Sequence, residues 1–390
     1  MTNRTIKTFD SAHDFIVRRL LPLGVIVLLT GLFWAKDGSQ FTKFYYGLIA
    51  APALLAALCR YRDLRAIIAE PMIRSYLLLF VWIAFSLTWS TTDNDAGSLL
   101  KRPLYVLMLF IAFALITLKD NDLLMQSLRI GAGLGALAAL GNLVYFHLYG
   151  LPGHRMVGSG ALHNPLLTSH LLGFLCTYWV ASWLSANERH DVVPIICALA
   201  LLGALIATGS RTPLMALALT SIWMTVMCGK RAFYLLALVC GATVLLLTLA
   251  PDTLLNRGLS YRPELWADAL RQALGQLWLG GGYDSNYLFD AGMKRGPMND
   301  PHNVELAVLL ELGLIGLTIW TVMYTQAFWH VLKYRTEANF QIASALMVYG
   351  IGAGLTEGGN FLSRPNESWF IIWVPLAICC ALAINRRHAR

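Results

Sequence analysis

DPHNVELAVLLELGLIGLTIWTVMY, residues 300–324, decides the fold, because a polar island passes directly into a long apolar run. From residue 304 onwards the run has the length, about 20 residues, that an α-helix needs to cross the hydrocarbon core of a bilayer. A backbone in lipid must satisfy its own hydrogen bonds, so a helix is the expected conformation. His302 places a proton acceptor at the water boundary of this helix, and ionisable groups at such positions usually have a function.

Apolar runs of similar length recur along the whole chain, in which 57% of the 390 residues are hydrophobic and 13% are charged. A soluble domain of this size needs a more polar surface, so we predict an all-α polytopic membrane protein, with residues 1–390 in one integral membrane domain. At roughly 20 residues per crossing we expect about twelve transmembrane helices. The first should remain as an anchor, since no cleavage site follows it. The expected spans are 17–35, 44–60, 73–90, 103–119, 128–149, 165–186, 192–209, 211–229, 232–250, 303–332, 338–357 and 367–385.

The distribution of basic residues predicts the orientation. With the N-terminus inside and an even number of spans, the inner loops collect most of the Lys and Arg residues, as the positive-inside rule requires. Both termini are therefore expected in the cytoplasm. This asymmetry explains most of the formal net charge of +8, so the basic composition does not indicate nucleic-acid binding. The inner residues are Arg4, Lys7, Arg18, Arg19, Arg60, Arg62, Arg65, Arg74, Lys230, Arg231, Lys333, Arg335, Arg386, Arg387 and Arg390.

The sequence indicates neither a cofactor nor a metal. All seven cysteines fall inside predicted spans, where they suit apolar packing better than disulfides or metal ligands. No Cys/His cluster has zinc spacing, and no GxxxxGK[ST] phosphate loop occurs. Asp93-Asn94-Asp95 resembles the acidic pair of some metal-dependent sugar transferases. Acidic residues on a short exposed loop are more often merely solvated, so a metal site there is the weaker alternative.

A long hydrophilic loop, residues 251–301, lies between the ninth and tenth predicted spans and is expected on the outer side. Pro263 suits the first turn of a helix. Gly280-Gly281-Gly282-Tyr283 then predicts a flexible turn. Because an unstructured loop of this length is uncommon without a function, we interpret it as functional rather than as a connector. The face of the expected amphipathic helix, lying along the membrane surface, is Trp266, Ala269, Leu270, Ala273 and Leu277.

Four arginines lie in the outer loops, where positive charge is disfavoured. Arg211 occupies a very tight turn, Arg155 precedes Asn164-Pro165, and Arg262 opens the loop helix. Arg364 lies in the last outer loop, and its role is open. These charges could serve only topology or lipid headgroups. A guanidinium, however, offers several fixed donors that suit a pyrophosphate, so we expect Arg155, Arg211 and Arg262 to converge on an anionic group.

His302 is expected inside the first turn of the helix, with Asp300 as N-cap and Pro301 as the first helical residue. The positive end of the helix dipole would then disfavour imidazolium, leaving a neutral proton acceptor. The same helix end could instead help bind a phosphate. Glu305, one turn further on, could orient the imidazole.

Acidic and small residues further along the same helix complete the pattern. Glu305 and Glu311 are costly in lipid and should face the protein interior. Gly313 and Gly316 are expected to allow another helix to approach closely, which is a structural role.

The set of residues resembles a known family. His302-Asn303, followed by Gly313 and Gly316, looks like the signature of O-antigen ligases, O-antigen polymerases and protein O-oligosaccharyltransferases. One position departs from the pattern: Met215 stands where leucine usually follows the turn arginine, a mild change of an apolar contact. Other segments that resemble family positions are Ser210-Arg211-Thr212, Arg262-Pro263-Glu264-Leu265-Trp266, and Arg155 ahead of Asn164-Pro165.

The resemblance implies a membrane glycosyltransferase of the C type in the bacterial inner membrane, with its active site facing the periplasm. It implies transfer of a glycan from undecaprenyl pyrophosphate to a sugar hydroxyl of lipid A–core. The reaction would need no metal and would invert the anomeric centre, and membrane lipids would surround the protein. Catalysis would fall to His302, Arg262 and Arg211. Pyrophosphate would be bound by Arg155, Arg211, Arg262 and Asn303, with support from Asp300, Glu305, Gly313 and Gly316.

Three alternatives stay open. An O-antigen polymerase would use a second lipid-linked glycan as acceptor. A protein oligosaccharyltransferase is less favoured, because those chains usually carry a soluble domain after the last span. A flippase or transporter could line a path with the arginines, but it should show repeated halves or paired broken helices, which we do not find.

Overall fold

The computed structural model describes residues 10–151, 153–186, 191–249, 262–290 and 297–388. In these residues the fold is helical, as predicted, and extended segments meet only in an isolated bridge between Phe289 and Met298. The first helix runs over Asp10–Phe33 and contains α2 (Leu21–Thr30). The others are α3 (Gly38–Tyr45), α4 (Ala51–Cys59), α5 (Tyr61–Ile68), α6 (Pro71–Ser86), α7 (Ala96–Lys119), α8 (Asn121–Tyr149), α9 (Pro165–Ser185), α10 (Val193–Ala207), α11 (Thr212–Cys228), α12 (Lys230–Leu249), α14 (Arg262–Gly275), α15 (Val304–Lys333), α16 (Ala338–Gly354) and α17 (Trp373–His388).

Every predicted span overlaps a helix, but fewer helices have the length and apolarity of a complete membrane crossing. Among the described residues five meet both conditions, and a sixth is added if α5 and α6, bent by 84° at their junction, form one broken span. The helices α10 and α11 are apolar but shorter. The chain is therefore a multi-pass membrane protein by composition and helix length, while the count of twelve stays a prediction. The five are Asp10–Phe33, Gly38–Cys59, Ala96–Lys119, Asp122–Tyr149 and Val304–Lys333.

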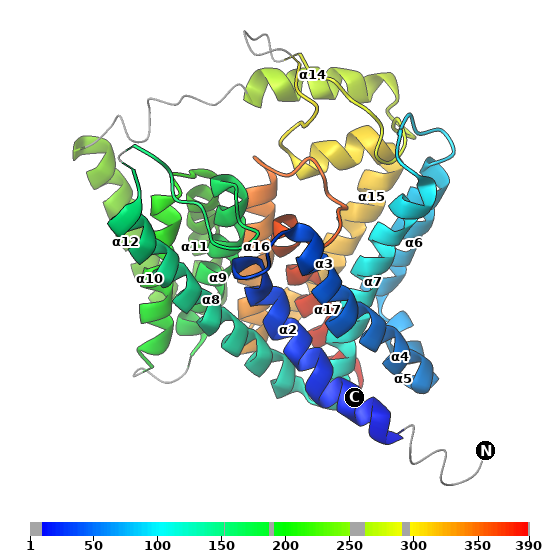
Figure 1. Cartoon of the computed structure of the whole chain (residues 1–390), viewed down its shortest axis with the longest axis horizontal. Helices are drawn as coiled ribbons and strands as arrows, with labels where there is room; N and C mark the ends of the chain where they lie inside the picture. The colour runs from blue at the N-terminus through cyan, green and yellow to red at the C-terminus, as the bar shows by residue number, and fades with distance from the viewer. Residues whose placement is uncertain (1–9, 152, 187–190, 250–261, 291–296, 389–390) are drawn as a thin grey trace.

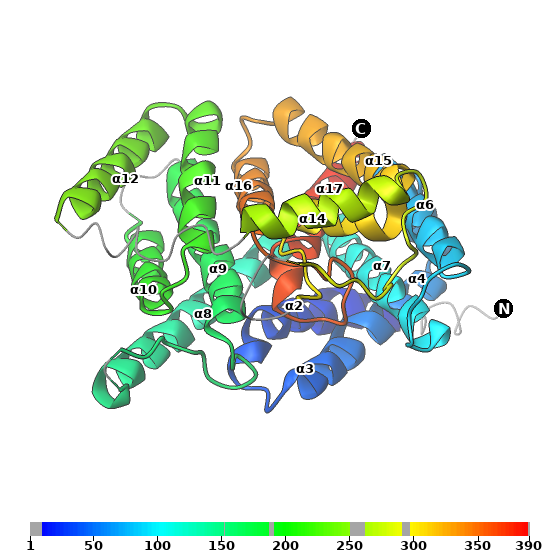
Figure 2. The ribbon, with the colours of Figure 1, turned by 90° about the horizontal axis from the view of Figure 1, so that it is seen from above.

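The helices form two groups with α16 and α17 between them (Figure 2). One group contains α8 to α12, and the other contains α2 to α7 together with α15. The helix α16 packs against α9 and α11 of the first group, and α17 packs against α7 of the second. Apolar side chains bury α17 almost completely, from Trp373 to Ile384. The buried helix α17 thus lies at the centre of the packing between the groups.

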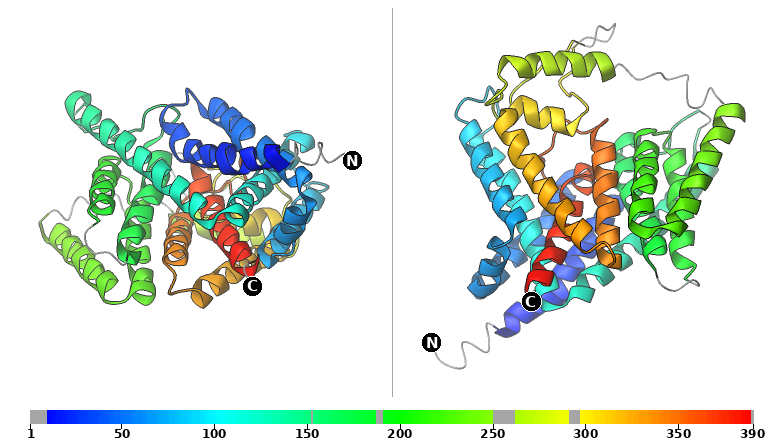
Figure 3. Two further views of the ribbon diagram at one scale, coloured as in Figure 1. Left: turned by 90° about the horizontal axis from the view of Figure 1, so that it is seen from below. Right: turned by 180° about the vertical axis from the view of Figure 1, so that it is seen from behind.

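The first helix begins and α17 ends on the side of the molecule opposite α14 (Figures 1 and 3). Several residues predicted for the inner side meet there. Arg386 pairs with Glu337 at the start of α16, and Arg387 donates a hydrogen bond to the carbonyl of Ala69 at 2.7 Å. These groups therefore share one side of the molecule, and its assignment to the cytoplasm stays a prediction. Arg4, Lys7 and Arg390 lie outside the described residues.

The helix α14 covers the other side of the molecule, and Arg262 is its first described residue (Figure 1). Of the long loop, residues 251–261 and 291–296 lie outside the described residues. The predicted apolar face was partly wrong, since Leu270 is 47% exposed and Leu277 follows the end of the helix. Ala269 and Ala273 of the predicted face are buried together with Leu265, because α14 packs onto α15. Its contacts are Leu265, Ala269 and Ala273 against Leu310 and Phe289.

The helix α15 is broken at Gly313, where φ is +66° and ψ is −170° (Figure 3). The backbone of residues 277–282 runs along the break. Gly281 and Gly282 donate hydrogen bonds to carbonyls of α15, and Leu314 donates to the carbonyl of Leu277 at 2.8 Å. The expected role of Gly313 is thereby corrected, because the close neighbour is this loop rather than another helix.

Replacing Gly313 with alanine should destabilise the protein by about 1–3 kcal/mol, since L-residues rarely adopt this backbone conformation. A Cβ there would also overlap the carbonyl oxygen of Trp278. Thermal unfolding in detergent measures the effect. Gly141→Ala is the control, because a Cβ at this helical position meets nothing within 4 Å. Equal transition temperatures for the two variants would contradict the assignment.

Candidate active site

One buried carboxylate, Glu357, connects two of the residues that the sequence singles out. It follows α16 in the chain, and its side chain is 6% exposed. Its Oε1 accepts a hydrogen bond from Nη2 of Arg262 at 2.5 Å. Its Oε2 lies 3.3 Å from Nδ1 of His302. A guanidinium and an imidazole therefore lie next to the two oxygens of a single carboxylate.

His302 lies before α15 and not in its first turn, which corrects the expected helix start. The N-cap is Asn303, whose Oδ1 accepts from the backbone N–H of Leu306 at 2.8 Å. The φ angle of His302 is +50°, outside the right-handed helical region. Asp300 is not the cap, since its Oδ1 accepts the backbone N–H of His302 at 2.7 Å in a tight turn.

The expected direction of the pKa shift of His302 was also wrong. The contact with Glu357 raises the pKa of the imidazole above its usual value and outweighs burial, with Asp300 adding to the increase. Burial works to raise the pKa of Glu357, but the nearby charges of His302, His170 and Arg262 outweigh it and lower that pKa. Glu357 is thus an ionised partner that favours a proton on His302. A carboxylate in contact has more influence here than a helix dipole whose first turn starts two residues later.

The backbone around His302 is held by close packing. A Cβ at Gly359 would overlap Oδ1 of Asp300, so the loop after Glu357 has no room for a side chain there. Trp266 of α14 donates a hydrogen bond to the carbonyl of Pro301 at 3.1 Å. Asn303 was expected to bind pyrophosphate, but both polar atoms of its side chain bond within the protein. Besides the cap made by its Oδ1, its Nδ2 donates a hydrogen bond to the carbonyl of Leu355 at 3.0 Å. These contacts fix the position of the backbone that carries His302.

Arg155 and Arg211 are brought together by the turn between α10 and α11. Nε of Arg155 donates to the carbonyl of Thr208 at 2.6 Å, and its Nη2 donates to Oγ of Ser210 at 2.8 Å. Gly209 in this turn has φ at +62°, a backbone conformation that favours glycine, while a Cβ there would lie at an ordinary distance of 3.5 Å from Nε of Arg155. Two of the expected arginines therefore share one loop cluster.

A hydrogen bond connects this cluster to Glu357. Thr212, next to Arg211, contacts Thr356, next to Glu357, through their hydroxyl oxygens at 3.1 Å. The loop that carries Arg155 and Arg211 thus lies next to the loop that carries Glu357, and the convergence of Arg155, Arg211 and Arg262 on one anionic group stays a prediction. Arg364 is elsewhere, with a 3.4 Å contact to Ser98 at the start of α7.

An apolar cavity of about 510 Å³ extends from Arg211 between α9 and α11. Among the described residues that line it, Arg211 is the charged one, and the others are mostly Leu, Ala, Met and Val. A positive group at one end of an apolar cavity suits an amphipathic lipid with an anionic head.

Asp93 and Asp95 have structural partners. Asp95 caps α7, accepting from the backbone N–H of Ser98 at 2.7 Å. Asp93 accepts from the side-chain amide of Asn286 at 2.9 Å. Within the described part of the chain, no group of three or more His, Cys, Asp or Glu residues is placed to hold a metal ion.

Sequence reasoning missed Glu357. The carboxylates within 4.0 Å of the His302 ring are, in the described residues, Asp300 and Glu357, so Glu305 does not take the orienting role expected of it. The available signal was a lone acidic residue in the outward segment Gly354-Leu355-Thr356-Glu357-Gly358-Gly359, which was assigned to the end of a span.

Comparison with known proteins places this site in a family. A protein of Pseudomonas aeruginosa named an O-antigen ligase is 41% identical over 374 residues, which are 95% of this chain and 92% of that relative. The chain belongs to the O-antigen ligase family. The sequence profile of that family, described as O-antigen ligase, matches residues 196–321, which include Arg211, Arg262 and His302. The chain is therefore a membrane enzyme of O-antigen attachment in lipopolysaccharide synthesis.

Proposed function

We propose that this ligase transfers O-antigen polysaccharide from undecaprenyl pyrophosphate to a sugar hydroxyl of lipid A–core at the periplasmic face of the inner membrane. The observation that carries the proposal is the arrangement of His302 and Arg262 on the two oxygens of Glu357. It places a proton acceptor beside a cation, and the reaction needs both.

In the proposed reaction the acceptor hydroxyl attacks the anomeric carbon of the first donor sugar. A new C–O bond forms as the bond to the pyrophosphate oxygen breaks, with inversion at carbon. With Nδ1–H directed at Glu357, Nε2 of neutral His302 takes the hydroxyl proton. Glu357 acts through His302 as a positioning residue, and the bonding electrons leave with the pyrophosphate.

The arginines supply the charge stabilisation. Undecaprenyl pyrophosphate is already a good leaving group, so fixed cations at its oxygens are the main requirement. Arg262 approaches from α14, Arg211 from the α10–α11 turn, and Arg155 from the α8–α9 loop, which is bonded to that turn. The apolar cavity below Arg211 would receive part of the lipid tail. Asn303 has a supporting role at the start of α15.

The proposed topology follows from this chemistry. A periplasmic site requires α14 on the outer side and the basic ends of α15 and α17 inside, as the positive-inside rule predicts. We retain about twelve spans at roughly 20 residues each, both termini in the cytoplasm and a C-type glycosyltransferase fold.

The test is ligation by purified protein with lipid-linked O-antigen and lipid A–core in excess EDTA. We expect full activity, seen on gels as polymer moving onto lipid A–core, because arginines replace the metal at the leaving group. Strict dependence on Mg²⁺ or Mn²⁺ would instead favour the Asp93/Asp95 site. Longer lipid-linked chains with unchanged lipid A–core would indicate a polymerase, and the absence of any covalent product would indicate a transporter.

A further inference from the structure

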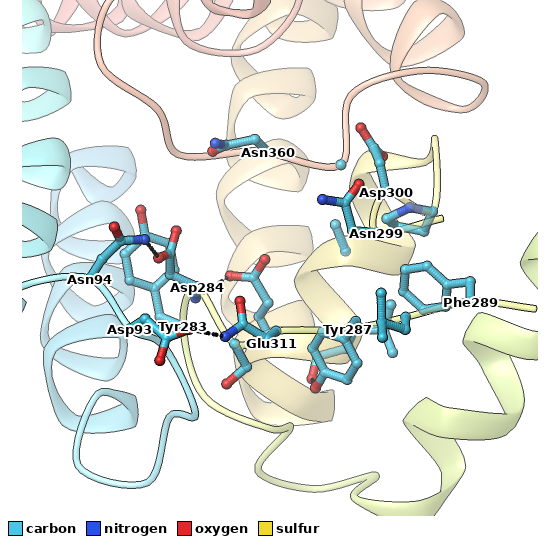
Figure 4. Close-up of a pocket in the computed structure, with 17 residues that line it drawn as sticks. Asp93, Asn94, Tyr283, Asp284, Tyr287, Phe289, Asn299, Asp300, Glu311 and Asn360 are labelled. Atoms are coloured by element: carbon cyan, nitrogen blue, oxygen red, sulfur yellow. Dashed lines mark hydrogen bonds between the residues drawn. The ribbon is translucent and has the colours of Figure 1, made fainter. Parts of the chain in front are cut away.

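A second cavity, of about 570 Å³, is lined by Asp300 and Pro301, which precede His302 in the chain, and by the first half of α15 (Figure 4). Its walls come from five places in the chain: the α6–α7 loop, residues 283–289, residues 299–301, the first half of α15, and the loop after Glu357. The proposed reaction leaves this cavity without an occupant. Its lining is mixed, with carboxylates, side-chain amides and aromatic rings in one space.

The charges of the lining exclude phosphate groups. The acidic residues are Asp93, Asp284, Asp300 and Glu311, and no Lys or Arg occurs among the described lining residues. Arg102 balances Asp284 from outside the lining, with Nη1 2.8 Å from Oδ1. The carboxylates of Asp93 and Asp300 still make the cavity unfavourable for an anion.

One wall is rigid because Asp284 is fully engaged. Besides Arg102, its carboxylate accepts from the hydroxyl of Thr92 at 2.8 Å and from the amide of Asn94 at 2.7 Å. Its backbone N–H donates to Oε2 of Glu311 at 2.8 Å. A site held by such contacts needs little reorganisation when a ligand binds.

Other polar groups in the cavity are not used by the fold. Oε1 of Glu311 and the side-chain amides of Asn299 and Asn360 form no hydrogen bond to another described residue. Figure 4 shows the two amides on separate segments around Glu311. The partly exposed ring of Tyr287 lies in the same wall and stacks on the buried ring of Phe289, with centroids 6.0 Å apart and planes 9° from parallel. Hydroxyl-binding groups beside an aromatic surface match a sugar ring, which is polar at its edge and apolar on its faces.

We infer that this cavity binds the acceptor saccharide as an uncharged sugar unit and presents its hydroxyl to His302. The inference rests on the proposed ligation. Asn299, Asn360 and Glu311 hydrogen-bond the sugar hydroxyls, and the acidic lining admits a sugar unit without phosphate.

The donor belongs on the other side of His302. Arg155, Arg211 and the apolar cavity connect to Glu357 through Thr212 and Thr356, whereas the acidic cavity connects to His302 through Asp300. A pyrophosphate is attracted to the first side and repelled from the second. Attack with inversion also requires the acceptor and the leaving group on opposite faces of the anomeric carbon.

The test uses the Asn299→Ala/Asn360→Ala double variant with purified lipid A–core and lipid-linked O-antigen. Losing hydrogen bonds to uncharged hydroxyls should raise the KM for lipid A–core about 10-fold and leave the KM for the donor unchanged. Core oligosaccharide released by mild acid should compete with lipid A–core, and its Ki should rise by the same factor. Removing its phosphates with aqueous hydrogen fluoride should not weaken competition.

Gln126→Ala is the matched control, because it removes an exposed amide on α8 and should leave both KM values at the wild-type level. A wild-type KM for lipid A–core in the double variant, a raised KM for the donor alone, or competition that requires phosphates would each overturn the acceptor site. Failure of the wild-type protein to ligate would refute the proposed function instead, so the two failures are distinguishable.

Discussion

Replacing His302 with alanine should lower the ligation rate by about 10²–10⁴-fold, the range typical for loss of a general base. The expected loss is in kcat, because the imidazole acts on the acceptor proton in the transition state, while donor binding depends on the arginines. Folding should be little affected. The imidazole is partly exposed, and its backbone is held by Asp300 rather than by the ring. Initial rates with saturating substrates, alongside thermal unfolding, measure the two effects.

His147→Ala provides the control, since it removes an exposed imidazole near the end of α8. We expect wild-type rates from it. If His302→Ala also ligated at the wild-type rate, His302 would not be the base. A rise in donor KM with unchanged kcat would make the imidazole a phosphate ligand, as the sequence reading left open.

Apolar run length was a sufficient guide to the helices. A segment such as residues 165–186 is recognised because its hydrophobicity is local information, and the observed helix α9 ends within a residue of that prediction. Whether a helix crosses a bilayer depends also on length, bends and neighbours. The 84° bend between α5 and α6 and the short helices α10 and α11 therefore could not be read from composition alone.

Two helix-capping signals compete at the start of α15. Asp300-Pro301 and Asn303 are both good cap sequences, and proximity to His302 favoured the first. The tertiary contacts select the second. Asn303 caps the helix and reaches Leu355, while Trp266 and Gly359 hold the Asp300 turn outside it. Local helix-capping propensities do not include the effect of these partners, because the partners are distant in sequence.

The site was predictable in part for a similar reason. Arg155, Arg211, Arg262 and His302 are conspicuous because charge in outer loops of a membrane protein is unusual. Glu357 is distant in sequence from each of them, and only folding brings it to Arg262 and His302. Glu305 was chosen because helical spacing is visible in sequence, whereas contact between segments is not.

Replacing Glu357 with glutamine should reduce ligation by about 10²-fold or more, since an orienting carboxylate fixes both the tautomer and the position of a catalytic imidazole. Glutamine keeps the shape and an acceptor for Arg262 but removes the negative charge. Circular dichroism and thermal unfolding in detergent verify the fold. Glu264→Gln, an exposed change on α14 close to Arg262, is the matched control and should keep wild-type activity.

The pH dependence of the ligation rate distinguishes a positioning role of Glu357 from a merely structural one. Neutral His302 is the proposed base, and Glu357 raises the pKa of His302, so the wild-type rate should rise with pH as the imidazole loses its proton above its usual range. Without the carboxylate that pKa falls, so in Glu357→Gln the rise should occur at lower pH. A lower rate with an unshifted midpoint would leave Glu357 with a structural role only, because disruption of the fold reduces activity without changing the proton affinity of one imidazole.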